Sequence, residues 1–186
     1  KYNIPFTINV VTGFPNHTAI LWWYLLEDLI KQPAVAFEVE NERMVFDTTN
    51  EEGRQACAQA VRRLVKYAEL SDYLPRVKAI FGQLGQDLQQ KTRDLSLNWE
   101  ELKRLGRDPL VTISAHTVNH PVLAKLAEDE VRREMLESKA ELERHLGRPI
   151  LHFAYPYGGK KQAEEREFQI AGKCGFLTAT TTRPAN

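Results

Sequence analysis

The chain has 186 residues, of which 42% are hydrophobic and 27% charged, as is ordinary for one globular domain with or without an insertion. Its 25 basic and 25 acidic residues cancel, so the charge gives no reason to expect nucleic acid or an anionic membrane as a partner. The longest apolar run, Ala19–Leu26, is too short for a transmembrane segment. Cys57 and Cys174 could pair, but we expect two buried free thiols.

The chain opens on a predicted strand, Phe6–Val11. Its continuous apolar character is typical of a strand buried on both faces, as in a parallel sheet. A turn cluster at Thr12–Asn16 ends it. The apolar run from Leu21 then begins a helix that we expect to reach about Lys31.

The middle of the chain has a different pattern. Alternating apolar residues in Ala34–Val39 and Arg43–Asp47 predict a β-hairpin. Two amphipathic helices follow, with Thr49 and Ser71 as the expected caps. We therefore interpret residues 34–96 as an inserted, mostly helical subdomain.

The rest of the chain, after residue 96, alternates predicted helices and strands. A capping box at Asn98 begins a helix, and a long amphipathic helix runs over roughly Glu128–Leu146. The predicted strands are Val111–Ile113, Ile150–Tyr155 and Phe176–Thr182. Such alternation implies parallel strands joined by helical crossovers.

Two histidines four residues apart, His116 and His120, directly follow the predicted strand Val111–Ile113. Pro121 cannot continue a helix and favours an extended backbone at the residue before it, so we expect the pair on a turn. The carboxyl ends of parallel strands are where α/β folds place their chemistry. Two imidazoles there suit a borderline metal such as zinc, although two unrelated histidines are the alternative. Thr117 excludes the helical metalloprotease pattern, which needs glutamate at that position.

The sequence H-T-V-N-H-P, His116–Pro121, resembles the second motif, H-(S/T)-x-x-H-P, of the polysaccharide deacetylases. These are the family-four carbohydrate esterases with the NodB homology domain. F-A-Y-P-Y-G, Phe153–Gly158, is similar to that family's third motif, which ends in P-Y-G. The resemblance covers Asn98–Thr182 and, less fully, Asn3–Trp23, but not the residues between them.

The resemblance implies an α/β fold, namely a distorted (β/α) barrel of the polysaccharide deacetylase type. Residues 1–186 would represent this domain in part, with the mostly helical insertion at 34–96 inside it. It also implies a hydrolase of carbohydrate metabolism that removes N-acetyl groups from an amino-sugar polysaccharide or oligosaccharide in a metal-dependent reaction. An N-acetylated glycan would be the partner, and the cell envelope or the exterior the compartment, with the cytoplasm left open.

The resemblance also implies roles for particular residues. His116 and His120 would bind a divalent metal, with zinc the first expectation and cobalt, nickel, manganese or iron(II) as alternatives. The backbone N–H of Tyr157 would stabilise an oxyanion, and the expected motif support comes from Thr117, Pro121 and Gly158. Substrate contacts are expected from Trp22, Trp23, Tyr155 and Pro156. Adjacent helical residues point about 100° apart, so one tryptophan is expected to pack in a core.

Parts of the family's chemistry are not in this sequence. The aspartate motif T-F-D-D is expected upstream of Lys1, and the late leucine–histidine motif beyond Asn186. The third metal ligand, the base and the acid are then missing, so we expect the segment alone to be inactive. Nothing in the sequence places a substitute from among Asp47, Asp108 and Asp129. The alternatives are a non-catalytic carbohydrate-binding or scaffold barrel, and a metal amidohydrolase for a small non-sugar amide.

Overall fold

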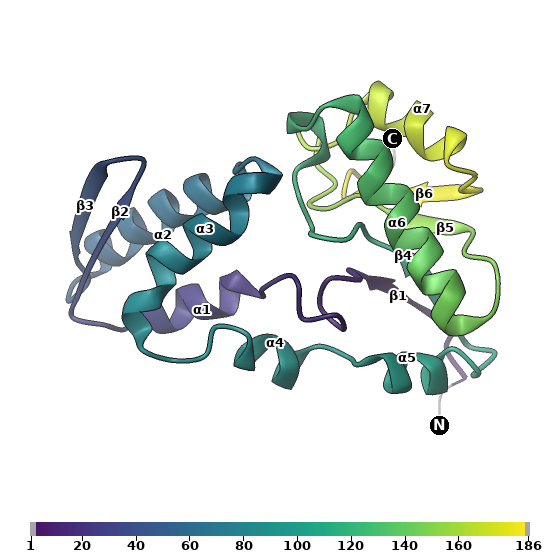
Figure 1. Cartoon of the computed structure of the whole chain (residues 1–186), viewed down its shortest axis with the longest axis horizontal. Coiled ribbons are helices and arrows are strands. Elements are labelled where there is room, and N and C mark those ends of the chain that lie inside the picture. Colours follow the sequence, from purple (N-terminus) through teal and green to yellow (C-terminus); the bar gives the residue numbers. More distant parts are fainter. Residues whose placement is uncertain (1–2, 185–186) are drawn as a thin grey trace. The chain divides into compact units, whose positions relative to one another are not determined.

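The computed structural model of the chain describes residues 3–184, so the two residues at either end of the expected domain lie outside it. The chain forms two compact units, which Figure 1 shows. The sheet unit contains Lys1–Thr18 and Ser96–Asn186, and the hairpin unit contains Ala19–Leu95. The hairpin unit begins before Ala34, the expected start of the insertion, and so takes in the helix that precedes it.

A four-stranded parallel sheet organises the sheet unit. Its strands are β1 (Phe6–Val10), β4 (Val111–Ala115), β5 (His152–Ala154) and β6 (Thr178–Thr180). They pair in the order β1-β4-β5-β6, and each pair is parallel. The predicted α/β fold with four neighbouring parallel strands is confirmed, whereas closure into a barrel stays a prediction.

Helices separate the strands along the chain, as parallel pairing requires. They are α5 (Trp99–Leu105), the short 3₁₀ helix η2 (Leu123–Lys125), α6 (Glu128–Leu146) and α7 (Glu165–Lys173). α6 packs against β4 and α7, as Figure 1 shows, and buries Val131, Met135 and Leu142. The capping box predicted at Asn98 is confirmed. None of the helices within residues 3–184 combines sufficient length with sufficient apolar character to span a membrane.

β1 differs from the expectation that it is buried on both faces. The side chain of Phe6 is half exposed, and among Phe6–Val10 only Val10 is buried. The reason is position, because β1 is the outermost strand on one side of the sheet and only β4 pairs with it among the described residues. Apolar composition alone does not distinguish an outer strand from a central one.

The hairpin unit is built on two antiparallel strands, β2 (Ala34–Val39) and β3 (Glu42–Asp47), which confirms the predicted hairpin. Its two turn residues, Glu40 and Asn41, both have left-handed backbone, with φ of 57° and 65°. This conformation matches the right-handed twist of the strands that it joins. The helices of the unit are α1 (Trp22–Leu29), α2 (Glu51–Lys66), α3 (Leu70–Phe81), η1 (Gly82–Leu84) and α4 (Gln90–Leu95).

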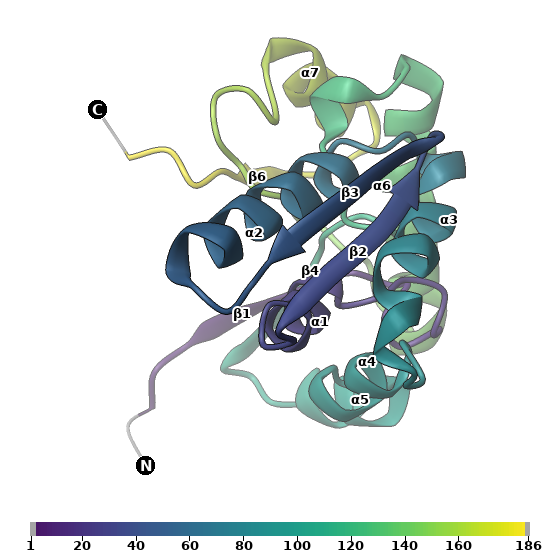
Figure 2. The same cartoon turned by 90° about the vertical axis from the view of Figure 1, so that its left-hand side faces the viewer.

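The core of the hairpin unit lies between the hairpin and its helices. In Figure 2, β2 and β3 lie side by side, with α2 along β3 and α3 along β2. Buried side chains come from β2, α1, α2, α3 and α4 but not from β3 or η1, and the fully buried ones include Leu25, Val35, Val61 and Phe81. Cys57 is buried here and Cys174 is buried in the sheet unit, both as free thiols, as expected.

The two predicted helix caps of this unit are wrong. α2 begins after Asn50, whose side chain accepts the N–H of Gly53 at 2.8 Å. The hydroxyl of Thr49 lies outside the helix and donates to Asp47 at 2.6 Å. Ser71 lies inside α3, whose N-cap residue is Glu69.

Candidate functional site

The carboxyl end of β4 carries the two histidines. The N–H of His116 donates to the carbonyl oxygen of Val10 at 2.9 Å, so the pairing with β1 continues into the turn. The ring centroids of His116 and His120 lie 4.8 Å apart. The ring of Tyr157, which follows β5, has its centroid 4.7 Å from that of His120. The prediction that both histidines and Tyr157 lie at one end of the sheet is confirmed.

The protonation state of His116 follows from its surroundings. Its Nδ1 lies 2.7 Å from the carbonyl oxygen of Ala154. A carbonyl oxygen only accepts, so Nδ1 carries the proton and Nε2 of the neutral ring keeps its lone pair. Burial lowers the pKa of His116 from its ordinary 6.5, although the hydrogen bond to Ala154 acts in the opposite direction. The neutral form is the one that binds a metal.

The turn between the histidines has a strained backbone. Thr117 and His120 have φ of 68° and 60°, in the left-handed region that residues other than glycine rarely adopt. The expectation of an extended backbone at His120 is therefore wrong. The hydroxyl of Thr117 accepts the N–H of His120 at 3.0 Å and donates to the carbonyl oxygen of His116, which closes the turn as predicted. Pro121 follows and is partly buried.

A carboxylate of α6, that of Glu134, supports this turn. It accepts the backbone N–H groups of Val118 and Asn119 at 2.8 and 3.0 Å, and the side-chain amide of Asn119 at 2.6 Å. Burial raises the pKa of Glu134, and the hydrogen bonds from Asn119 and Val118 oppose that shift. Glu134 was not among the candidate site residues of the sequence analysis. Its spacing from Val131 and Ser138 is the signal that could have placed it on the buried stripe.

The turn after β5 is packed tightly against the chain that follows β6. Tyr157 and Gly158 both have left-handed backbone, with φ of 63° and 61°. A Cβ atom on Gly158 would lie 2.5 Å from the backbone nitrogen of Thr182. The hydroxyl of Thr182 donates to the carbonyl oxygen of Tyr157 at 2.8 Å. Glycine is therefore required here for close approach to the protein's own backbone.

Several of the expected substrate-binding side chains serve in packing. Trp22 is only 5% exposed and lies in the core of the hairpin unit, and Trp23 packs partly buried against that core. Tyr155 is 4% exposed, and its ring contacts the rings of Phe153 and Phe168. Pro156 is buried as well. Core packing of one tryptophan, here Trp22, is as expected. The burial of Tyr155 and Pro156 differs from the expected substrate contacts, because it leaves little of either side chain for a ligand.

The donor atoms of His116 and His120 are of a kind that suits a metal ion. Two imidazoles, one oriented by a backbone carbonyl, are ligands that zinc and similar ions prefer. The described residues contain no group of three or more His, Cys, Asp or Glu side chains that could hold a metal ion. Within the sheet unit, Asp108 and Asp129 therefore do not complete the set. The pair alone supplies fewer protein ligands than a catalytic zinc site normally takes.

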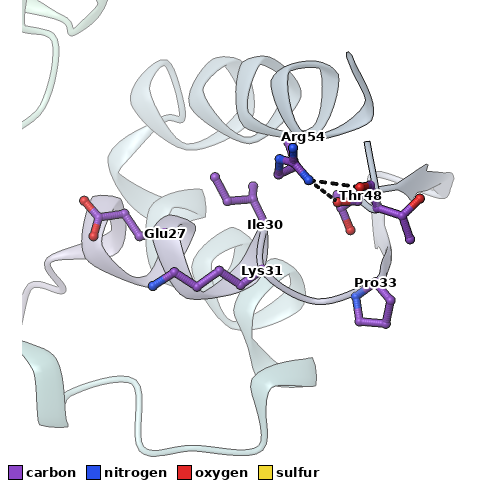
Figure 3. Close-up of a pocket in the computed structure, with 7 residues that line it drawn as sticks. Glu27, Ile30, Lys31, Pro33, Thr48 and Arg54 are labelled. Carbon is purple, nitrogen blue, oxygen red and sulfur yellow. Dashed lines mark hydrogen bonds between the residues drawn. The ribbon is translucent and has the colours of Figure 1, made fainter. Parts of the chain in front are cut away.

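The hairpin unit has an open hollow of about 830 Å³, drawn in Figure 3. Its most prominent cation is Arg54, whose guanidinium donates to the carbonyl oxygens of Thr48 and Thr49 and pairs with Glu51. Lys31 lies 3.6 Å from Asp28. The two cations that line the hollow thus both pair with carboxylates of the same unit.

A comparison with protein families matches residues 43–179 to one family, polysaccharide deacetylase. The chain belongs to the polysaccharide deacetylase family. The match begins within β3, so it extends over residues of the hairpin unit where the sequence shows none of the family's motifs. No curated protein matches the chain.

Three solved structures illustrate the similarity. The deacetylase PplD of Streptococcus pyogenes, solved with acetate, is 28% identical over 48% of this chain and 38% of that one, with a TM-score of 0.45. A de-N-acetylase from Aggregatibacter actinomycetemcomitans is 13% identical over 97% of this chain and 54% of that one, with a TM-score of 0.47. A family-four pseudoenzyme from Bacillus anthracis is 20% identical over 44% of this chain and 28% of that one, with a TM-score of 0.39. The chain thus spans about half or less of each of these proteins.

Proposed function

We propose that the parent protein, meaning this chain together with the family motifs expected on either side of it, is a metal-dependent carbohydrate deacetylase. Its reaction would be hydrolysis of N-acetyl groups on an amino-sugar polysaccharide or oligosaccharide. Membership of the polysaccharide deacetylase family supports the substrate class. The observation that carries the proposal is the meeting of His116 and His120 at the carboxyl end of the sheet, beside Tyr157.

Each residue has a definite task in this proposal. His116 would bind the metal through Nε2 while Nδ1 stays bonded to Ala154, and His120 would supply the second nitrogen. Bound there, a divalent metal, zinc in first place, supplies polarisation of the acetamide carbonyl and activation of water. The backbone N–H of Tyr157 would donate to the oxyanion, a role that the family resemblance implies. No residue of this chain is assigned as base or acid.

The test is acetate release from a chitin-type oligosaccharide, with zinc or cobalt added, by the parent protein and by the 186-residue chain. We expect release by the parent and none by the chain, because a positioned base typically contributes about 10²- to 10⁴-fold. Equal release by both would show that the chain holds a base that we have not identified. No release by a metal-loaded parent would contradict the proposed activity.

A second candidate is a non-catalytic glycan-binding protein with the same fold. The observation in its favour is that His116 and His120 have no third ligand among the described residues. This candidate predicts that the parent binds N-acetylated oligosaccharide without releasing acetate. Binding measured by calorimetry alongside the acetate assay separates the two functions.

A further inference from the structure

Glu134 is an unusual residue for its place in the fold. It lies on the buried stripe of α6, beside Met135, and is only 2% exposed. Apolar side chains normally occupy such positions, since burial of a carboxylate is costly unless it is paired or hydrogen-bonded. Within residues 3–184, all its hydrogen bonds come from the turn between His116 and His120, here called the histidine turn, and none comes from a basic side chain. The compensation for its burial thus comes entirely from Val118 and Asn119.

The histidine turn is held from two sides, because its carbonyl oxygens accept hydrogen bonds on one side and its N–H groups donate them on the other. On one side, the carbonyl oxygens of Thr117 and Val118 accept the N–H groups of Thr12 and Gly13, at 3.1 and 2.9 Å. On the other side, the N–H groups of Val118 and Asn119 donate to Glu134. The backbone N–H and carbonyl groups at the middle of the turn therefore both have hydrogen-bond partners elsewhere in the sheet unit, in the loop after β1 and in α6.

Such support is needed because of the turn's conformation. Left-handed backbone at Thr117 and His120 costs conformational free energy and persists only where the surroundings enforce it. Without Glu134, two backbone N–H groups would lose their acceptor, and the turn would gain freedom to relax. The separation and orientation of the two imidazoles depend on this turn.

We propose that Glu134 is a positioning residue, whose carboxylate holds the backbone N–H groups of Val118 and Asn119 and thereby keeps His116 and His120 oriented to bind one metal ion. The inference rests on the proposed function, because it concerns the same histidine pair. Glu134 would act through the turn and not as a ligand. Groups that orient metal ligands in this way typically contribute about 10- to 100-fold to metal affinity.

The test compares Glu134→Gln and Glu134→Met with a matched control, Glu137→Gln, an exposed glutamate of the same helix. The glutamine is isosteric but has one acceptor oxygen in place of two, and the methionine fills the same space with no acceptor. Two measurements are made on the 186-residue chain, namely zinc affinity by competition with a chelating dye, and amide hydrogen exchange at Val118 and Asn119 without metal. We expect both Glu134 variants to bind zinc about 10- to 100-fold more weakly and to exchange these amides faster. Glu137→Gln removes a nearby charge that helps to raise the pKa of Glu134 but no contact with the turn, so it is expected to leave the zinc affinity and the amide exchange nearly unchanged.

A residue that only fills the core would behave differently. In that case Glu134→Met would keep wild-type zinc affinity and wild-type amide protection, and this result would overturn the inference. If both Glu134 variants fail to fold, Asn119→Ala tests the same contact, since it removes one of the three hydrogen bonds and should weaken zinc binding by a smaller factor. Unchanged affinity in Asn119→Ala would then count against the inference. Absence of zinc binding by the wild-type parent protein would contradict the proposed function, while amide exchange in the 186-residue chain would still decide whether Glu134 holds the turn.

Discussion

The imidazole of His116 donates from Nδ1 to the carbonyl oxygen of Ala154, 2.7 Å away, and so joins the end of β4 to the end of β5. Within the described residues, the ladder between these two strands has a single registered pair, Ala115 with Phe153. The side-chain bond therefore adds a second link between the strands at the edge where the site lies. It fixes the ring's orientation and its tautomer together, which is what a metal ligand requires.

The first prediction concerns pH. Burial lowers the pKa of His116 below 6.5 in the folded chain, so the unfolded chain takes up a proton there first as the pH falls. The free energy of unfolding of the metal-free chain should therefore decrease as pH falls through about 6.5, and should not depend on His116 well above it. Urea unfolding in the presence of a chelator, at a series of pH values between about 5 and 8, measures this dependence.

The control for the pH series is His116→Gln, whose side-chain amide can still donate to Ala154 but does not titrate in this range. The difference in stability between wild type and variant isolates His116 from the other histidines. We expect the wild type to lose stability relative to His116→Gln as the pH falls below about 6.5. A difference that stays constant over the whole series would show that His116 is not held neutral by the fold.

The second prediction concerns the hydroxyl of Thr117. Thr117→Val keeps the shape of the side chain but removes the acceptor for the N–H of His120. Loss of that acceptor should lower the free energy of unfolding by about 1–3 kcal/mol and should also weaken zinc binding. Thr117→Ser retains the hydroxyl and should retain most of the zinc affinity. Equal zinc affinity in the valine and serine variants would show that this hydrogen bond does not organise the turn.

The third prediction concerns Gly158. Gly158→Ala would place a methyl group 2.5 Å from the backbone nitrogen of Thr182, in addition to the cost of a left-handed alanine. The matched control is Gly147→Ala, in the same unit, where φ is 66° and no atom lies near the added methyl group. In the control, the free energy of unfolding should fall only by the cost of a left-handed alanine, of order 1–2 kcal/mol. In Gly158→Ala it should fall by more. Equal losses in denaturant unfolding would mean that the close contact with Thr182 has no energetic consequence.

The features of this fold that local pattern determines could be predicted from the sequence. The β-branched run before His116 gave the strand, Pro121 gave the turn after the histidines, and the helices between strands required parallel pairing. The place of the histidine turn at the carboxyl end of β4 followed from those facts. The hairpin followed from alternating residues on either side of Glu40 and Asn41.

What could not be predicted depends on contacts between distant residues. The exposure of Phe6 depends on which strands flank β1, and the left-handed backbone of His120 depends on the hydroxyl of Thr117. The role of Glu134 was missed because a glutamate on a helix normally faces solvent, and its partners are 15 and 16 residues away. The burial of Tyr155 likewise follows from aromatic neighbours on other elements, Phe168 among them.

The most direct test of the account is the metal content of the parent protein and of its double variant, His116→Ala with His120→Ala. Both proteins are loaded with zinc, dialysed and analysed for metal per chain. The account predicts about one zinc ion per chain in wild type and almost none in the double variant, since both expected nitrogen ligands are gone. Zinc stoichiometry that is the same in the two proteins would contradict the claim that His116 and His120 form a metal site.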